Sequence, residues 1–295
     1  MRNRQSSKVI ALLKLLRVSS WLKNVFVFVP IVFAKHIFEQ NYLVEGILAF
    51  IAFSMASSLV YVFNDLIDLE KDRIHPVKKN RPIANGSISK SNAVFIIVLL
   101  FVAVILFSQR FNWQFVVTLW AYILLNFFYT MWLKQVVIVD IFSIALGFML
   151  RVFSGAFAVN VFISNWLILT TIFISLFLAV MKRRVEISGG PNAADQRAVL
   201  KDYTLSFIDQ ISAITAGGVI ICYALYSVSE RTVREFGNES LVFTTFFVIF
   251  GIFRYMFLVY KKEKGENVAE VLLSDMPMII NAFLFVAVAV YIIYF

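Results

Sequence analysis

Four oxygen-bearing side chains lie close together in one stretch of this sequence and could bind a metal ion. Asn64, Asp65, Asp68 and Asp72 follow a long apolar run, and at about 100° per helical residue they fall within an arc of about 100°. Such side chains repel one another unless a positive charge lies among them, and the carbonyl end of a helix adds negative potential. Because magnesium prefers oxygen ligands and accepts substrate phosphates as further ligands, the pattern predicts a magnesium site for a diphosphate.

Basic residues follow the acids at once, and basic side chains bind phosphates. The segment contains Arg73, His75, Lys78, Lys79 and Arg81. Pro76 and Pro82 are expected to break the helix and turn the segment back. Arginine binds phosphate through a planar fork and lysine as a point charge, so acids and bases together suit a metal-bound, phosphorylated substrate. Two alternatives stay open: a solvated helix end neutralised by its neighbours, and bases that only fix membrane topology.

A second polar stripe is expected farther along the chain. Its members recur at steps of three or four residues and therefore share one helix face: Asp140, Ser143, Gly147, Arg151 and Ser154. An arginine near the middle of an apolar run costs about 2.5–3.5 kcal/mol on insertion scales, so Arg151 should face a polar cavity. We expect a phosphate or carboxylate partner for it, with a structural ion pair as the alternative.

Further candidate ligands lie at the ends of other apolar runs. Lys182 and Glu186 are four residues apart and should share a helix face, with Arg183 beside them. Tyr203 closes the segment that these residues open, and Tyr129 and Lys134 end an earlier run. These residues are candidates for binding the other end of the substrate, although each could equally be structural.

The elements that must position these residues are membrane-spanning helices. The 295 residues are 61% hydrophobic and 15% charged, with a mean hydropathy of +0.84, which is far more apolar than a soluble domain. Runs long enough to cross a bilayer are expected at 24–38, 43–63, 92–109, 113–132, 138–157, 163–181, 205–229, 241–260 and 274–295. The sequence therefore predicts an interfacial segment, 1–23, and one all-α membrane domain, 24–295, that is a bundle of nine helices with long loops at 64–90 and 182–204.

The distribution of charge predicts the orientation of this bundle. Most of the 27 Lys and Arg residues fall on the side of the N-terminus, including both long loops. The connections on the opposite side hold Lys35, Arg110, Arg231 and Arg234. Positive residues concentrate on the cytoplasmic side of inner membranes, so the N-terminus and the site should be cytoplasmic and the C-terminus outside. The net charge of +9 then has a topological cause and does not indicate nucleic-acid binding.

Several motifs together resemble a known family. The Asn64-Asp65-x-x-Asp68-x-x-x-Asp72 pattern, nine spans and two long loops resemble the UbiA superfamily of intramembrane prenyltransferases. Within it, the stretch from Asp72 to Gly86 resembles the decaprenyl-phosphate phosphoribosyltransferase branch. The same resemblance includes Trp21-Leu22-Lys23-Asn24, Tyr129 to Lys134, Asp140 with Gly147 and Arg151, and Lys182-Arg183 with Glu186.

The resemblance implies a reaction, in which 5-phosphoribose passes from 5-phosphoribosyl 1-diphosphate to a polyprenyl phosphate in the lipid bilayer. It implies Mg²⁺ on Asn64, Asp65, Asp68 and Asp72, with the three aspartates catalytic. It implies substrate contacts for Lys23, Asn24, Arg73, His75, Lys78, Lys79, Arg81, Tyr129, Lys134, Asp140, Arg151, Lys182, Arg183, Glu186 and Tyr203. Ordinary family members carry a second aspartate-rich motif where this chain has Lys182-Arg183-Arg184-Val185-Glu186, and a basic site can receive a phosphate directly. In the resembled branch the product serves cell-wall synthesis.

Two other readings remain open from the sequence. One is a prenyltransferase that moves a prenyl group from its diphosphate to an aromatic acceptor, and the basic 182–186 segment argues against it. The other is an ion-coupled transporter, which would place acids near the bilayer midplane rather than at one surface. The length of the lipid and the oligomeric state, homo-oligomers included, cannot be read from the sequence.

Overall fold

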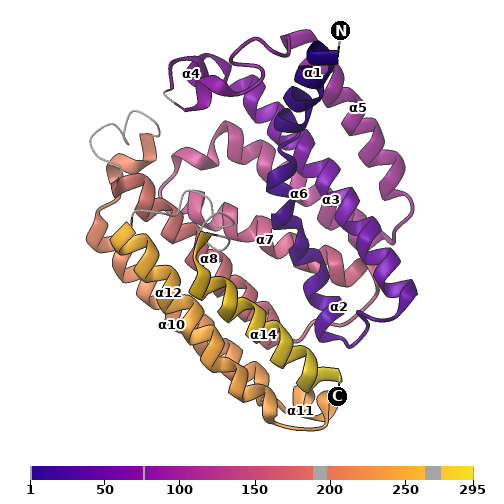
Figure 1. Cartoon of the computed structure of the whole chain (residues 1–295), viewed down its shortest axis with the longest axis vertical. Helices are drawn as coiled ribbons and strands as arrows, with labels where there is room; N and C mark the ends of the chain where they lie inside the picture. The colour runs from indigo at the N-terminus through magenta and orange to yellow at the C-terminus, as the bar shows by residue number, and fades with distance from the viewer. Residues whose placement is uncertain (1, 76, 189–197, 263–273, 295) are drawn as a thin grey trace. The chain divides into compact units, whose positions relative to one another are not determined.

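The structure, a computed structural model, describes residues 2–75, 77–188, 198–262 and 274–294, and the regular elements in that part are all helices (Figure 1). Eight helices there are long and apolar enough to cross a membrane. The count rises to nine if Val9–Leu15 and Val18–Phe33, which meet at a bend of 47°, form one broken span. The predicted all-α bundle is therefore confirmed. At the predicted first span, 24–38, the structure has two shorter helices instead of one: a 3₁₀-helix that ends at Phe28 and an α-helix, Val29–Phe33.

The chain contacts divide the protein into two compact units. Unit 1 comprises residues 1–132 and 150–161, and unit 2 comprises 133–149 and 162–295. Unit 1 contains α1 (Arg2–Leu15), η1 (Val18–Phe28), α2 (Val29–Phe33), α3 (Gln40–Ile67), α4 (Leu69–Ile74), η2 (Lys78–Asn80), α5 (Lys90–Ser108), α6 (Trp113–Met131) and the last part of α7 (Val139–Ala158). The symbol η marks a 3₁₀-helix.

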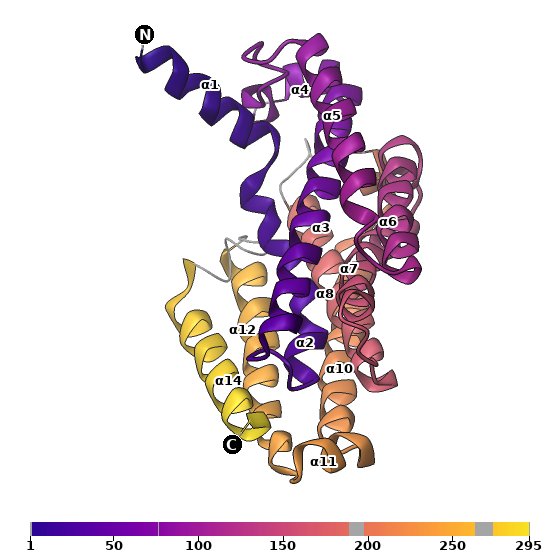
Figure 2. The ribbon, with the colours of Figure 1, turned by 90° about the vertical axis from the view of Figure 1, so that its right-hand side faces the viewer.

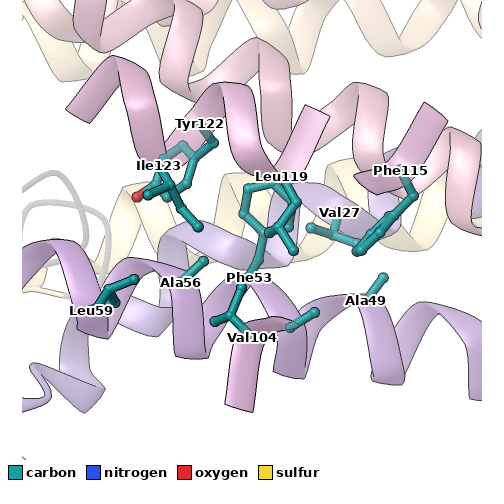
Figure 3. Close-up of a cluster of buried hydrophobic side chains, with 11 residues drawn as sticks. Val27, Ala49, Phe53, Ala56, Leu59, Val104, Phe115, Leu119, Tyr122 and Ile123 are labelled. Atoms are coloured by element: carbon teal, nitrogen blue, oxygen red, sulfur yellow. The ribbon is translucent and has the colours of Figure 1, made fainter. Parts of the chain in front are cut away.

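The core of unit 1 lies around α3, whose small residues let its neighbours approach closely. Ala49, Ala52 and Ala56 are buried on α3, and Phe53 fills the space between them and α6. In Figure 3, Phe53 points toward Leu119 and Phe115, and its ring meets that of Phe115 edge-on with centroids 6.3 Å apart. Small residues at such positions allow the close backbone contact that stabilises helix pairs in membranes.

Side-chain caps fix where several long helices begin. The Ser89 hydroxyl accepts a hydrogen bond from the Asn92 backbone at the start of α5, and the Asn112 side chain accepts one from Phe115 at the start of α6. Thr204 does the same for α10 (Leu205–Ser227). Such a cap satisfies one of the amide groups that the first helical turn leaves without a partner.

The N-terminal segment of unit 1 packs tightly on the bundle. At Arg17 the chain takes a left-handed conformation, φ 49°. Figure 2 shows the preceding helix, α1, projecting away from α3. The following helix, η1, lies so close to α7 that a Cβ atom built on Gly155 would stand 1.9 Å from the backbone oxygen of Val27. The absence of a side chain at Gly155 therefore allows η1 to pack directly against α7.

Unit 2 is built from long helices and short connections. It contains the first part of α7, η3 (Leu133–Gln135), α8 (Asn165–Ser188), η4 (Ala198–Asp202), α10, α11 (Glu230–Phe236), η5 (Ser240–Thr244), α12 (Thr245–Lys262) and α14 (Met276–Tyr294). Its largest core joins α8, α10 and α12 through buried residues such as Phe177, Val219 and Tyr255. Arg254 on α12 binds both carboxylate oxygens of Asp275, at 3.0 and 2.9 Å, and this pair ties α12 to the start of α14.

Candidate functional site

The acidic stretch of unit 1 is helical but not one continuous helix. α3 ends at Ile67 and α4 begins at Leu69, so the predicted unbroken extension of the span is wrong at Asp68. The backbone bonds still follow the helical pattern, from Asp68 N to Asn64 O at 2.9 Å and from Asp72 N to Asp68 O at 2.8 Å. The acids therefore remain near one another. Asp65 and Asp72 are buried, and Asn64 and Asp68 are half-buried.

Two arginines supply the positive charge that the acids require. One nitrogen of Arg81, Nη1, lies 2.6 Å from Asp72 Oδ2 and 3.1 Å from Asp65 Oδ1. Arg17 forms an ion pair with the same oxygen of Asp65, and its guanidinium lies 4.8 Å from the centre of the Tyr61 ring. The charge that the sequence demanded among the carboxylates is therefore partly supplied by the protein itself.

The geometry fits a cation held between two carboxylates. A single Arg81 nitrogen reaches both Asp65 and Asp72, which means that these two side chains can share one positive centre. In the described part of the chain, no three His, Cys, Asp or Glu side chains gather closely enough to hold a metal ion. Magnesium commonly takes one or two protein carboxylates and completes its shell with water and substrate phosphates, so the donor set is adequate for it. Asn64 accepts a hydrogen bond from Thr130 at 3.2 Å.

The basic segment after the acids separates into residues at the acidic cluster and residues away from it. Arg81 joins the cluster, as described. Arg73 is exposed and binds Glu70 at 3.1 and 3.0 Å, which is a local contact on α4. The ring nitrogen Nδ1 of His75 accepts the backbone amides of Val77 and Lys78, both at 3.2 Å, so His75 shapes the turn. Lys78 is half-buried and Lys79 is exposed.

Arg151 belongs to a buried polar cluster that anchors η1. Its Nε donates to Asn24 Oδ1 at 2.8 Å, and its Nη2 donates to the Tyr122 hydroxyl at 2.9 Å. The Asn24 amide in turn donates to the hydroxyls of Ser54 and Ser57 on α3, at 3.1 and 3.2 Å. The predicted polar surroundings of Arg151 are therefore present, and these partners are neutral groups.

The neighbours of Asn24 in the sequence extend this anchor. The indole nitrogen of Trp21 donates to Ser58 at 3.0 Å, and Ser58 donates to the backbone of Leu16 at 2.9 Å. Lys23 is half-buried on the same 3₁₀-helix. The Trp21-Leu22-Lys23-Asn24 motif therefore fixes η1 to α3 and α7 by hydrogen bonds.

A second charged cluster lies in unit 2. Asp140 and Arg183 are both fully buried, and the carboxylate Oδ2 lies 2.5 Å from the guanidinium Nε. The other oxygen of Asp140 accepts a hydrogen bond from the Tyr203 hydroxyl at 2.7 Å, and that hydroxyl accepts the Ile138 amide at 2.6 Å. Burial, together with the hydrogen bond to Asp140, raises the pKa of Tyr203.

Arg183 also binds Glu186, which lies one helical turn farther along α8. The other oxygen of Glu186 lies 4.0 Å from the ammonium of Lys182, so the predicted shared face of these two residues is confirmed. Both are in α8, which runs to Ser188 and includes the first residues of the predicted 182–204 loop. Lys134 in η3 and Tyr129 in α6 are half-buried, and they belong to different units.

Three partners of the predicted residues were missed by the sequence analysis. Arg17 binds Asp65, Tyr122 binds Arg151, and Thr130 binds Asn64. Each is a contact between distant parts of the chain, which helical periodicity cannot reveal. The charge balance of the acidic face indicates that basic partners exist but does not say which ones.

The sequence profile of the UbiA prenyltransferase family matches residues 25–281, which is most of the 295-residue chain and includes the acidic cluster from Asn64 to Asp72 and the charged cluster of unit 2. This chain belongs to that family. The predicted resemblance is confirmed, and as a UbiA family member the chain is a multi-pass, membrane-bound transferase.

Two relatives with similar sequences are both named decaprenyl-phosphate phosphoribosyltransferase. The decaprenyl-phosphate phosphoribosyltransferase of Mycolicibacterium smegmatis is 31% identical over 232 residues, which are 77% of this chain and 73% of the relative. That of Corynebacterium glutamicum is 33% identical over 238 residues, covering 76% and 70%. This chain is thus similar to the two enzymes over most of its own length and most of theirs.

A solved UbiA homologue supports the fold. The structure from Archaeoglobus fulgidus, bound to GPP and Mg²⁺, matches with a TM-score of 0.73 and covers 97% of this chain and all of that one. At 16% identity this likeness concerns the fold alone. It confirms the UbiA-like helical architecture that the sequence predicted.

Proposed function

We propose that this chain transfers 5-phosphoribose from 5-phosphoribosyl 1-diphosphate to a polyprenyl phosphate. Similarity over most of the chain to decaprenyl-phosphate phosphoribosyltransferases carries the proposal. In this reaction the bond between ribose C1 and the diphosphate oxygen breaks, and its electron pair leaves with the diphosphate. An oxygen of the lipid phosphate forms the new bond to C1. No further reactant is needed for atoms and charges to balance.

The acidic cluster of unit 1 is proposed to hold the diphosphate end of the donor. Asn64, Asp65, Asp68 and Asp72 offer the oxygen ligands that magnesium prefers, and Arg81 already bridges two of the carboxylates. Bound there, Mg²⁺ would stabilise the negative charge that develops on the departing diphosphate. We therefore assign the three aspartates to catalysis.

The basic residues are proposed to bind phosphates rather than to transfer protons. The attacking phosphate of the lipid is already an anion near neutral pH, so the reaction needs no strong general base. Lys78, Lys79 and Arg81 follow the acids directly, which suits contacts to the donor. The other residues that we propose for substrate binding, either in contact with the substrate or holding a contacting side chain in place, are Lys23, Asn24, Arg73, His75, Tyr129, Lys134, Asp140, Arg151, Lys182, Arg183, Glu186 and Tyr203.

The orientation of the chain is a further part of the proposal. Because most Lys and Arg residues lie on the side of the N-terminus, we place that end and both clusters in the cytoplasm. Reporter enzymes that are active on one side of the membrane, fused after the last residue, test this placement. A C-terminal reporter active in the cytoplasm would contradict it.

The decisive experiment is a donor comparison with purified protein in detergent. Radiolabelled phosphoribosyl diphosphate, Mg²⁺ and a polyprenyl phosphate should give a labelled lipid and free diphosphate, and chelation of the metal should abolish both. Prenyl diphosphate with an aromatic acceptor should give no product. Product from the second mixture and none from the first would refute phosphoribosyl transfer and favour prenyl transfer.

A further inference from the structure

Arg183 has no surface to offer a ligand, although its position in a basic motif suggests a phosphate contact. Its side chain is fully buried and is among the largest side chains in the described core. Its guanidinium binds a carboxylate on each of two elements, Asp140 on α7 and Glu186 on α8. A ligand could touch this group only if the side chains that bury it moved aside.

The contacts form a chain in which each carboxylate uses both oxygens. Asp140 accepts the Tyr203 hydroxyl on Oδ1 and the Arg183 guanidinium on Oδ2. Glu186 meets Arg183 through Oε2 and Lys182 through Oε1. Two acids and two bases balance in charge, so the network can be buried at one end without an uncompensated ion.

Exposure increases along this chain from one end to the other. Tyr203, Asp140 and Arg183 are buried at its inner end. Glu186 exposes 21% of its side chain and Lys182 exposes 37%. Lys182 is therefore the basic member of the network that can reach a ligand in solution or at the membrane surface.

From this geometry we infer that Arg183 is a positioning residue, and that Lys182 is the residue of this network that binds a phosphate group of the substrate. The buried pair with Asp140 fixes Arg183, Arg183 fixes Glu186, and Glu186 orients the Lys182 ammonium. The inference rests on the proposed function, because it assumes that a phosphorylated substrate binds at this cluster. The phosphate could belong to either the lipid or the ribosyl donor.

A double-mutant cycle measured by equilibrium binding tests this inference. Radiolabelled polyprenyl phosphate and radiolabelled phosphoribosyl diphosphate are bound separately to the purified protein in detergent. Lys182→Gln should weaken binding of one of them about 10-fold or more, as loss of a charged hydrogen bond does, and so identify the phosphate. Arg183→Gln should weaken binding of the same ligand by no more than this.

The double variant separates the two roles. If Arg183 acts through Lys182, adding Arg183→Gln to Lys182→Gln should change the affinity little further. If Arg183 binds the phosphate itself, the two losses should multiply to about 100-fold. Multiplicative losses would overturn the inference, and so would a Lys182→Gln protein that binds both ligands normally.

Arg184→Gln provides a matched control on the same helix. Arg184 binds Asp209 at 2.8 Å and lies 3.7 Å from the centre of the Tyr260 ring, outside the network. This variant should leave both affinities unchanged. An Arg184→Gln protein that reproduced the loss seen for Arg183→Gln would mean that the charge of α8, not the network, determines binding.

Glu186→Gln keeps the test decisive if Arg183→Gln does not fold. Removing a carboxylate next to a phosphate site should strengthen binding if Lys182 and Arg183 each bind the phosphate directly. It should weaken binding if Glu186 orients Lys182, and strengthened binding would overturn the inference. Normal ligand binding without transfer would refute the proposed reaction alone, whereas a wild-type protein that binds neither ligand would overturn both.

Discussion

Gly155 gives the sharpest structural prediction, because a single methyl group there would collide with backbone atoms. A Cβ atom would lie 1.9 Å from the Val27 oxygen, 2.8 Å from its carbonyl carbon and 3.0 Å from its Cα. Since carbon atoms prefer separations of about 3.5–4.0 Å, α7 and η1 would have to separate by roughly 1.5 Å. Backbone cannot rotate away as a flexible side chain can, so the segment bearing Asn24 must move.

The cost of Gly155→Ala follows from two effects. Overpacking of this kind costs about 1–3 kcal/mol, partly offset by the gain of about 0.5–1 kcal/mol from alanine in a helix. A shift of η1 also loosens the bonds from Asn24 to Arg151, Ser54 and Ser57, at about 1 kcal/mol for each bond lost. We therefore expect a net loss of about 2–4 kcal/mol.

Thermal unfolding followed by circular dichroism in detergent measures this loss. Gly155→Ala should lower the melting temperature by roughly 5 °C or more. Gly217 is the matched control, since it lies inside α10 and a Cβ atom there would meet nothing within 4 Å. Gly217→Ala should leave the melting temperature unchanged or raise it slightly. Equal melting temperatures for Gly155→Ala and wild type would refute the close approach of η1 and α7.

Three further predictions concern charged and polar pairs. The Asp72→Asn protein should fold, because Arg81 retains its ion pair with Asp65. Its rate of phosphoribosyl transfer in the donor assay should fall at least about 100-fold. Burial raises the pKa of Tyr203 above its ordinary value of 10.0, so its contribution to stability is present below pH 10 and is lost as the pH rises further. Tyr203→Phe should cost about 1 kcal/mol at neutral pH and lack this alkaline loss in unfolding measurements. Asp275→Asn should weaken the two-bond pair with Arg254, because it removes the carboxylate charge, and should lower the melting temperature.

The long helices were predictable because their signal is local and large. The run predicted at 113–132 corresponds to α6, Trp113–Met131, and the run at 205–229 to α10, Leu205–Ser227. About 20 apolar residues in succession suffice to indicate a span, and no tertiary contact has to be known. The segment before α3 fails this test for a physical reason. Its apolar residues form a 3₁₀-helix and a short α-helix that bend, and hydropathy does not distinguish these from a straight span.

The site was predictable in its residue types but not in its pairing. The spacing of Asp65 and Asp72 brings them together, as their common contact with Arg81 demonstrates, and the need for positive charge among them followed from electrostatics. The identity of the second cation did not follow. Arg17 lies where the chain turns through a left-handed conformation, φ 49°, and from there it reaches Asp65. Glycine and asparagine are the residues that usually indicate such a turn in a sequence, and this position is an arginine.

The same reasoning explains why Arg183 was read as a phosphate ligand. In the sequence, Lys182 and Arg183 are adjacent basic residues, and either of them could bind an anion. On a helix, adjacent residues point in directions about 100° apart, so one of them can face the interior while its neighbour faces outward. Asp140, distant in sequence, decides which one is buried, because a buried arginine needs a buried carboxylate. In this network Arg183 is therefore buried and Lys182 is partly exposed, and binding measurements on the two residues test whether Lys182 alone contacts the phosphate.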